Sequence, residues 1–235
     1  MQFARALREG RLLRRYKRFL ADIDLSDGMR ITAACPNTGS MLGCVTPGNR
    51  VWLSESDSPS RKYRHTWELV EVGDVPVGIN TMLPNRLVRE AIANGVLIEL
   101  AGYESLRGEV RFGTENSRVD LLLSGPRRAD CYVEVKNVSA AVSNGVALFP
   151  DAVSARGTKH LRELMRLQRA GQRAVLVYCV QRGDVREVRP ADDIDPRYGQ
   201  TLREALACGV EVLAYRARVT TTEIMLVERI AVCCP

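Results

Sequence analysis

The hydrophobic pattern of this 235-residue chain changes its period close to Pro84. Before that point, short alternating runs are separated by turn sequences such as Ser26-Asp27-Gly28, a pattern typical of β-strands. No stretch of this region has the 3.6-residue spacing of an amphipathic helix. Small closed β-barrels are built from such strands, and the OB-like barrel is a common nucleic-acid-binding version. The pattern predicts about five short strands, at residues 11–25, 29–34, 49–54, 67–72 and 75–79.

After Pro84, helical and strand-like segments alternate. Residues 85–94 place four apolar side chains on one stripe before Gly95, a typical helix end. The order α-β-β-β-α-β, followed by α-β, predicts a mixed α/β (α+β) domain. We therefore place the domain boundary between residues 80 and 84, which gives domains 1–82 and 83–235. The elements expected after the first helix are strands at 109–112, 117–123, 131–138, 173–180 and 210–214, and helices at 158–170 and 201–208.

Two of the predicted strands carry charged residues of the kind that take part in catalysis. Strand alternation puts Glu134 and Lys136 on one face, and Asp120 interrupts an otherwise apolar strand. A lone carboxylate there is costly unless it is paired or binds a metal. Two carboxylates on neighbouring strands suit Mg²⁺ or Mn²⁺, and a lysine can orient water or stabilise charge on phosphorus. Asp120 and Glu134 are therefore predicted metal ligands and, with Lys136, catalytic residues. An Asp–Lys ion pair beside an exposed glutamate is the alternative.

The spacing D-x(13)-E-x-K, from Asp120 to Lys136, resembles the signature of the PD-(D/E)xK nuclease superfamily. That resemblance implies the same α-β-β-β-α-β core. It also implies that the first helix can supply another metal-site carboxylate, and Glu90 matches that position as a further metal-binding and catalytic candidate. An exposed helical glutamate is the alternative for Glu90. Glu115, in the turn before the Asp120 strand, ranks below it.

Longer segments extend the resemblance over nearly the whole chain. They are residues 15–22, 35–41 (Cys-Pro-Asn-Thr-Gly-Ser-Met), 61–63, 65–68, 117–120, 134–136, 149–153 and 156–161. In combination they resemble the sugar fermentation stimulation protein A (SfsA) family. The resemblance implies an N-terminal OB-like domain, a C-terminal restriction-endonuclease-like domain and DNA binding in a prokaryotic cytoplasm. The family's name describes an effect on sugar use and does not define a biochemical activity.

Positive charge is concentrated in two segments. The first twenty residues hold seven Arg and Lys residues against Glu9 alone, and further arginines repeat at helical spacing within 158–170. The formal net charge of +6 permits a polyanionic partner, although solvated faces are the alternative for each cluster. Trp67 is a further candidate for base stacking, with a core position as its alternative. The nucleic-acid-binding candidates are Arg14, Arg15, Lys17, Arg18, Lys62, Tyr63, Lys159, His160, Arg162, Arg166 and Arg169.

These observations together predict a DNA-binding protein with little sequence preference and a Mg²⁺-dependent deoxyribonuclease activity. The alternative is a non-catalytic DNA-binding regulator linked to sugar-metabolism genes. The apolar runs are too short for a membrane span and the Arg-rich start lacks a secretory core, so a cytoplasmic protein is expected, with nucleoid association and homodimer formation open. Seven scattered cysteines without a C-x-x-C pair predict buried or incidental thiols.

Overall fold

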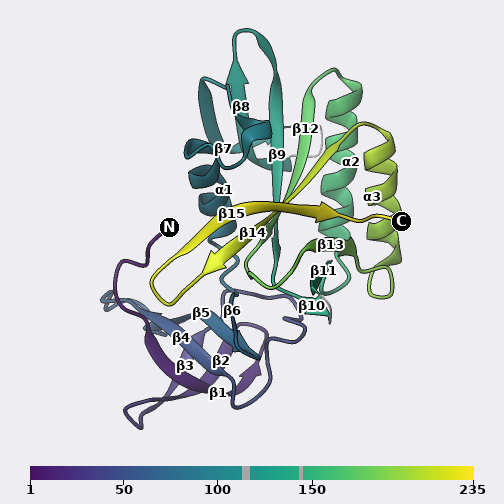
Figure 1. Cartoon of the computed structure of the whole chain (residues 1–235). Coiled ribbons are helices and arrows are strands. Elements are labelled where there is room, and N and C mark those ends of the chain that lie inside the picture. Colours follow the sequence, from purple (N-terminus) through teal and green to yellow (C-terminus); the bar gives the residue numbers. More distant parts are fainter. Residues whose placement is uncertain (113–116, 143–144) are drawn as a thin grey trace.

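The computed structural model describes residues 1–112, 117–142 and 145–235, and their strands form two separate sheets (Figure 1). The first sheet has the order β3-β2-β1-β4-β5-β6, and β3 also pairs with β5. That pairing closes β1 to β5 into a barrel around Leu12, Ile23 and Trp67, which are fully buried. The expected OB-like barrel is thereby confirmed, and Trp67 is a core residue. The strands are β1 Arg8–Tyr16, β2 Leu20–Leu25, β3 Arg30–Ala34, β4 Arg50–Glu55, β5 His65–Val72 and β6 Val75–Gly78.

The prediction of one strand over residues 11–25 is wrong, because a turn separates β1 from β2. Lys17 and Arg18 lie in this turn with φ of 48° and 65°. Left-handed backbone is usually marked by Gly, Asn or Asp, so two basic residues gave no turn signal. Lys17 and Arg18 consequently project from a hairpin end and not from the strand where they were expected.

The second sheet has the order β10-β11-β13-β15-β14-β12-β9-β8-β7 within the described residues. Its strands are β7 Ser105–Phe112, β8 Ser117–Gly125, β9 Arg128–Val138, β10 Ala141–Val142, β11 Val146–Phe149, β12 Arg173–Val180, β13 Glu187–Pro190, β14 Glu211–Val219 and β15 Ile224–Val232. The helical segments are α1 Pro84–Ala93, η1 Ile98–Leu100, α2 Ala155–Arg169 and α3 Pro196–Ala207. The run α1-β7-β8-β9-α2-β12 confirms the predicted order. Strands β10, β11, β13 and β15 were not predicted.

Strand β12 shows how the helices cover the two faces of this sheet. Val175 and Val177 pack in one apolar cluster with α1, whereas Leu176 and Tyr178 pack in another with α2 and α3. Because strand side chains alternate, these clusters lie on opposite faces. Figure 1 shows α2 and α3 side by side and α1 apart from them. Helix α2 begins after Ser154, whose Oγ accepts a hydrogen bond from the backbone N–H of Gly157 at 3.0 Å.

The barrel and the second domain share contacts beyond the linker. Trp52 and Leu69 of the barrel belong to the apolar cluster that surrounds α1. The Gly78 N–H donates to the Gln181 carbonyl at 2.8 Å. At the chain start, the Phe3 N–H donates to Thr222 O at 3.0 Å, so the first residues lie against the β14–β15 turn and outside the barrel. The two domains therefore pack together through both apolar and backbone contacts.

The cysteines are free thiols, and four of them are buried: Cys35, Cys44, Cys131 and Cys179. Burial raises the pKa of Cys44 to about 11 and that of Cys131 to about 12. Such thiols carry little thiolate at neutral pH, so they act as packing groups. Among the described helices, none is long and apolar enough to cross a membrane.

Candidate active site

Three neighbouring strands bring three carboxylates into a row. Glu109 lies in β7, Asp120 in β8 and Glu134 in β9. In the antiparallel registers, Gly108 and Val110 pair with Leu121 and Val119, so Glu109 lies across from Asp120. Leu121 pairs with Val133, which brings the next residues, Asp120 and Glu134, side by side. Glu109 has a φ of 56°, a left-handed conformation that is uncommon for glutamate. Backbone of this kind concentrates at functional sites, so Glu109 joins the candidates for the site.

Asp120 is held from two directions. Its Oδ2 accepts a hydrogen bond from the Val135 N–H at 2.7 Å, and its Oδ1 accepts one from Asn85 Nδ2 at 2.9 Å. Burial, followed by the charge of Glu134, raises the pKa of Asp120 above its ordinary value, and these two hydrogen bonds oppose the rise only in part. The same Asn85 amide lies 3.5 Å from Glu109 Oε1, so Asn85 links the two carboxylates.

Glu134 is buried, with a relative exposure of 4%, and yet it is held in the ionised form. Burial alone would raise its pKa, but the hydrogen bond from His160 and the charge of Lys136 outweigh burial and lower it. Lys136 Nζ donates to Glu134 Oε1 at 2.7 Å, and His160 Nδ1 contacts the same oxygen. Glu134 is therefore the centre of a buried charged cluster. Lys136 lies on the same face of the strand as Glu134, as the strand alternation predicted.

The ring of His160 has a defined orientation. An ionised carboxylate can only accept hydrogen bonds, so Nδ1 carries the hydrogen that faces Glu134. The other ring nitrogen, Nε2, accepts a hydrogen bond from Arg156 Nε at 3.3 Å. His160 was predicted to meet DNA from the start of the second helix. Its place in the first turns of α2 puts it against Glu134 and Lys136, and its contact with DNA stays a prediction.

A pocket of about 480 Å³ opens beside this cluster. Asp120 and Glu109 line its acidic side, and His160 lines it from α2. Four basic side chains complete the wall: Arg111, Arg118, Arg156 and Lys159. The basic side chains can neutralise the phosphates of a polyanion, and this allows one phosphate to lie close to the carboxylates.

Glu90 does not join this group. Its carboxylate accepts a hydrogen bond from Arg86 Nε at 2.8 Å and pairs with the N-terminal ammonium group of Met1 at 2.7 Å. Arg89, four residues after Asn85, lies close to β7, whereas Glu90 is about 100° further round the helix. The helix thus presents Asn85, and not Glu90, to Asp120. Glu115 falls within residues 113–116, outside the described residues.

The residues present suit a hard divalent cation only in part. Asp120 and Glu134 offer carboxylate oxygens on adjacent strands. The raised pKa of Asp120 reflects its burial first and the charge of Glu134 second, and a bound cation would offset both. In the part of the chain that the structure describes, no group of three or more His, Cys, Asp and Glu side chains has metal-binding geometry. Water molecules commonly complete the Mg²⁺ shell around one or two carboxylates, so the pair still fits such an ion.

Two basic residues of the barrel are engaged in holding a loop. Arg15 Nη2 donates to the carbonyl oxygens of Arg18, Asn37 and Gly39 at 2.7, 2.9 and 2.8 Å. Arg18 donates through Nε and Nη2 to Thr38 O at 3.0 and 2.8 Å. Arg15 and Arg18 were predicted to present their charge to DNA. Their contact with DNA stays a prediction. Their hydrogen bonds in the structure fix the loop around Thr38, because several of its carbonyl groups converge on the two guanidinium groups.

The remaining basic candidates of the barrel are at its surface. Arg14 Nε donates to Asp22 Oδ2 at 2.8 Å, so the exposed Arg14 forms an ion pair with Asp22. Lys17 is exposed in the β1–β2 turn. Lys62 Nζ lies 5.6 Å from the centre of the Tyr63 ring. None of these three basic side chains lines the pocket beside Asp120.

The basic candidates of α2 divide into two groups. Lys159 and His160 line the pocket beside Asp120. Arg162, Arg166 and Arg169 are exposed further along the helix, and Arg166 pairs with Glu163. Of the two groups, only the first therefore shares this pocket with the predicted catalytic residue Asp120.

Glu109, Asn85 and Arg156 belong to this site but were not among the predicted residues. Glu109 begins a predicted strand, and its acidic side chain next to apolar Val110 was an available signal. Arg156 lies within a segment that carried the family resemblance. Asn85 gave no signal, because a polar residue at a helix start is ordinary.

The fold and this site together define a two-domain protein in which an OB-type barrel precedes a restriction-endonuclease-like domain. Two family descriptions match the chain. "SfsA N-terminal OB domain" covers residues 13–79, and "Sugar fermentation stimulation protein RE domain" covers residues 82–223. The chain belongs to the sugar fermentation stimulation protein family, as its sequence segments predicted.

Relatives and a solved structure agree with this membership. A protein named "Sugar fermentation stimulation protein homolog" from Thioalkalivibrio sulfidiphilus is 64% identical over 98% of this chain and 96% of its own length. Its namesake from Geobacter sulfurreducens is 60% identical over 99% and 98%. A structure described as "The structure of Pyrococcus Furiosus SfsA in complex with Ca2+" superposes with a TM-score of 0.89 at 27% identity, over 99% of this chain and 98% of that one.

Proposed function

We propose that the protein binds DNA with little sequence preference and hydrolyses its phosphodiester bonds with Mg²⁺ or Mn²⁺ as cofactor. One observation carries the proposal: Lys136 and His160 converge on the buried Glu134, and His160 and Asp120 line a pocket with four basic side chains. Buried charged clusters of this kind cost desolvation free energy, and they are concentrated at functional sites. Phosphodiester hydrolysis accounts for both the carboxylates and the basic wall.

Asp120 and Glu134 would hold the metal ion, with Glu109 as the nearest further carboxylate. The Pyrococcus furiosus relative is described in complex with Ca²⁺, which is also a hard divalent cation with oxygen ligands. That description supports a divalent-metal site in this chain. When bound, Mg²⁺ would polarise the phosphate as a Lewis acid and offset its charge.

Lys136 is assigned the role of orienting the attacking water. Its Nζ keeps one hydrogen bond to Glu134 and has further N–H groups for the water or for a phosphate oxygen. His160 holds the Glu134 carboxylate in place, and Arg118 and Arg156 bind the phosphates on either side. Each of these groups acts on the position or the charge of the reacting phosphate, which is where most catalytic stabilisation arises.

A non-catalytic DNA-binding regulator with the same fold is the second candidate. It is favoured by the lack of a group of three or more metal-binding side chains among the described residues. Incubation of supercoiled plasmid and of single-stranded DNA with Mg²⁺, Mn²⁺ or EDTA separates the two. Metal-dependent strand cleavage by the wild type, lost in Glu134→Gln, supports the nuclease. Binding without cleavage in either metal supports the regulator.

Glu109 and Glu90 should differ in their effects on metal binding. Glu109→Gln should weaken Mn²⁺ affinity about tenfold to a hundredfold, as is typical when a residue next to the direct metal ligands is replaced. Glu90→Gln should leave the affinity unchanged and instead lower the melting temperature, because Glu90 pairs with Met1 and Arg86. Isothermal titration with Mn²⁺ and thermal melting of both variants measure the two effects. A loss of Mn²⁺ affinity confined to Glu90→Gln would reverse the assignment.

DNA binding should depend on the basic wall of the pocket and on salt. Arg111→Gln with Arg118→Gln should flatten the slope of log affinity against log salt by about 1.5 to 2 for a duplex, because each lost phosphate contact removes about 0.9. The loss should be the same for unrelated sequences. Fluorescence anisotropy across a salt series measures it.

The matched control is Arg127→Gln, an exposed residue at the opposite end of the β8–β9 hairpin. A second comparison, Arg162→Gln with Arg169→Gln, tests the outer face of α2 separately. Arg127→Gln removes one charge where the double variant removes two, so a loss about half as large in Arg127→Gln would show that overall charge, and not this pocket, sets the affinity.

A further inference from the structure

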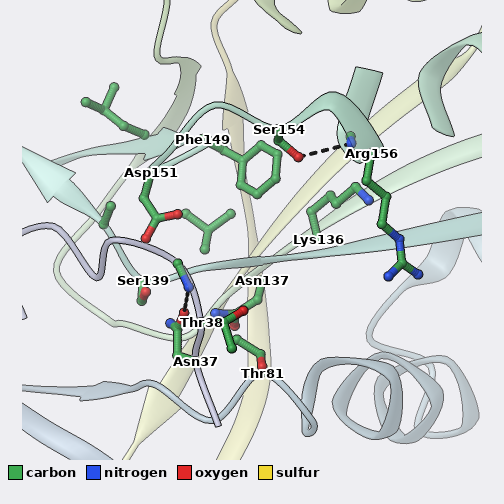
Figure 2. Close-up of a pocket in the computed structure, with 15 residues that line it drawn as sticks. Asn37, Thr38, Thr81, Lys136, Asn137, Ser139, Phe149, Asp151, Ser154 and Arg156 are labelled. Carbon is green, nitrogen blue, oxygen red and sulfur yellow. Dashed lines mark hydrogen bonds between the residues drawn. The ribbon is translucent and has the colours of Figure 1, made fainter. Parts of the chain in front are cut away.

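A second cavity, of about 350 Å³, lies between the barrel and the second domain. One wall is the barrel loop of residues 37–39, and the other comes from the end of β9 and the segment between β11 and α2. Figure 2 shows Asn37, Thr38 and Thr81 facing Lys136 and Arg156 across this space. The volume falls within the range of roughly 300–1,000 Å³ typical of small-ligand sites.

The barrel wall of this cavity is fixed by both domains. From the barrel, Arg15 and Arg18 hold the loop carbonyls. From the second domain, Asp151 Oδ2 accepts a hydrogen bond from the Met41 N–H at 2.8 Å. Gly39 allows this approach, since a Cβ there would lie 2.8 Å from the Asp151 carboxylate oxygens. A wall held in this way is preformed, which lowers the entropy lost when a ligand binds.

The interdomain cavity adjoins the proposed catalytic site. Lys136 lines it, while the Nζ atom of the same residue contacts Glu134. Arg156 lines both this cavity and the pocket beside Asp120, and its Nε donates to His160. A phosphate at Asp120 and Glu134 would thus have Arg156 on one side and the interdomain cavity directly beyond.

The chemistry of the lining suits a nucleobase with its sugar. Hydroxyl and amide groups of Thr38, Thr81 and Asn137 can hydrogen-bond to a base edge, and the Phe149 ring adds an aromatic surface. Met82 and Val153, which follow and precede the lining residues Thr81 and Ser154 in the sequence, are 78% and 77% exposed. Exposed apolar side chains at nucleic-acid interfaces commonly wedge between base steps and unstack them.

We propose that the interdomain cavity receives one unpaired nucleotide of the DNA strand whose neighbouring phosphate lies at Asp120, Glu134 and Lys136. The phosphate position rests on the proposed function. A cavity of this size admits one nucleotide and excludes a base pair within a helix. The protein therefore prefers single-stranded DNA, or duplex regions whose ends or mismatches free a base.

Thr38→Trp should fill the cavity with the larger side chain. The backbone carbonyl of residue 38 still accepts the hydrogen bond from Arg18 in this variant. Binding is measured by fluorescence anisotropy in EDTA, so that no cleavage occurs, with a single-stranded oligonucleotide and the matching duplex. The wild type should bind the single strand at least about tenfold more tightly, and Thr38→Trp should lose at least about tenfold on the single strand only, as expected for one stacked base. Thr46→Trp, an exposed threonine of the same barrel, is the control and should change neither affinity.

Thr38→Val provides a milder variant that keeps the volume and removes the hydroxyl, and it should weaken single-strand binding several-fold. Equal affinity of the wild type for both DNA forms would overturn the proposal, as would unchanged single-strand binding in both Thr38 variants. Because these assays contain no divalent metal, they remain informative if the wild type fails to cleave DNA. A single-strand preference without cleavage would support the cavity and reject the nuclease.

Discussion

Glu134→Gln and Asp120→Asn should each lower DNA cleavage by at least about a thousandfold, because removal of a metal-site or transition-state charge costs this much in related chemistry. Both variants should also lose Mn²⁺ binding. Lys136→Ala should keep Mn²⁺ binding and still lose cleavage about a hundredfold or more, because the lysine acts on the attacking water and not on the metal. Single-turnover cleavage of labelled DNA and Mn²⁺ titration measure the two properties separately.

The melting temperature of the metal-free protein shows whether these variants are still folded. The folded-state pKa of Asp120 lies above its unfolded value, so its contribution to stability is fully present below the unfolded pKa and is lost as pH rises through the folded pKa. Above the folded-state pKa the ionised carboxylate therefore costs stability, and Asp120→Asn should remove this part of the pH dependence of the melting temperature in the metal-free protein. Cleavage that persists in all three variants would refute the assigned site, whatever their stability.

Arg15→Ala should destabilise the protein by about 3 kcal/mol, because it removes charge-assisted hydrogen bonds to three backbone carbonyls at once. For a protein of this size, that loss corresponds to a fall of about 6–12 °C in the melting temperature. The carbonyls of Arg18, Asn37 and Gly39 would lose this partner, and the loop beside the interdomain cavity would loosen. Single-strand affinity should consequently fall together with stability.

Lys17→Ala is the matched control for Arg15→Ala, since Lys17 carries the same charge two residues away and is exposed in the turn. It should shift the melting temperature little and affect only the salt-dependent part of DNA binding. Thermal melting by circular dichroism and anisotropy at two salt concentrations compare the variants. If both variants behave alike, Arg15 acts as surface charge and has no role in holding the loop.

The sequence by itself determined the order of the main elements and the central residues of the candidate site. The change in hydrophobic period at Pro84 predicted a β-barrel followed by an α-β-β-β-α-β core, because a local period reports which face of an element is buried. Strand alternation also placed Glu134 and Lys136 on one face. An apolar strand around Asp120 identified its carboxylate as one that needs a partner. Each of these inferences depends only on residues that are close together in the sequence.

Only the tertiary structure decided which distant residues meet. Glu109 lies across from Asp120 because of the β7–β8 register, which is set by how the two strands pair and not by either strand alone. Helix α1 presents Asn85 to the site while Glu90 pairs with the N-terminus, which depends on how the helix is rotated against the sheet. The charge of Arg15 was visible in the sequence, but two of its three carbonyl partners, Asn37 and Gly39, come from a loop more than twenty residues away. Contacts between elements distant in sequence arise from packing, and a pattern read along one segment does not contain them.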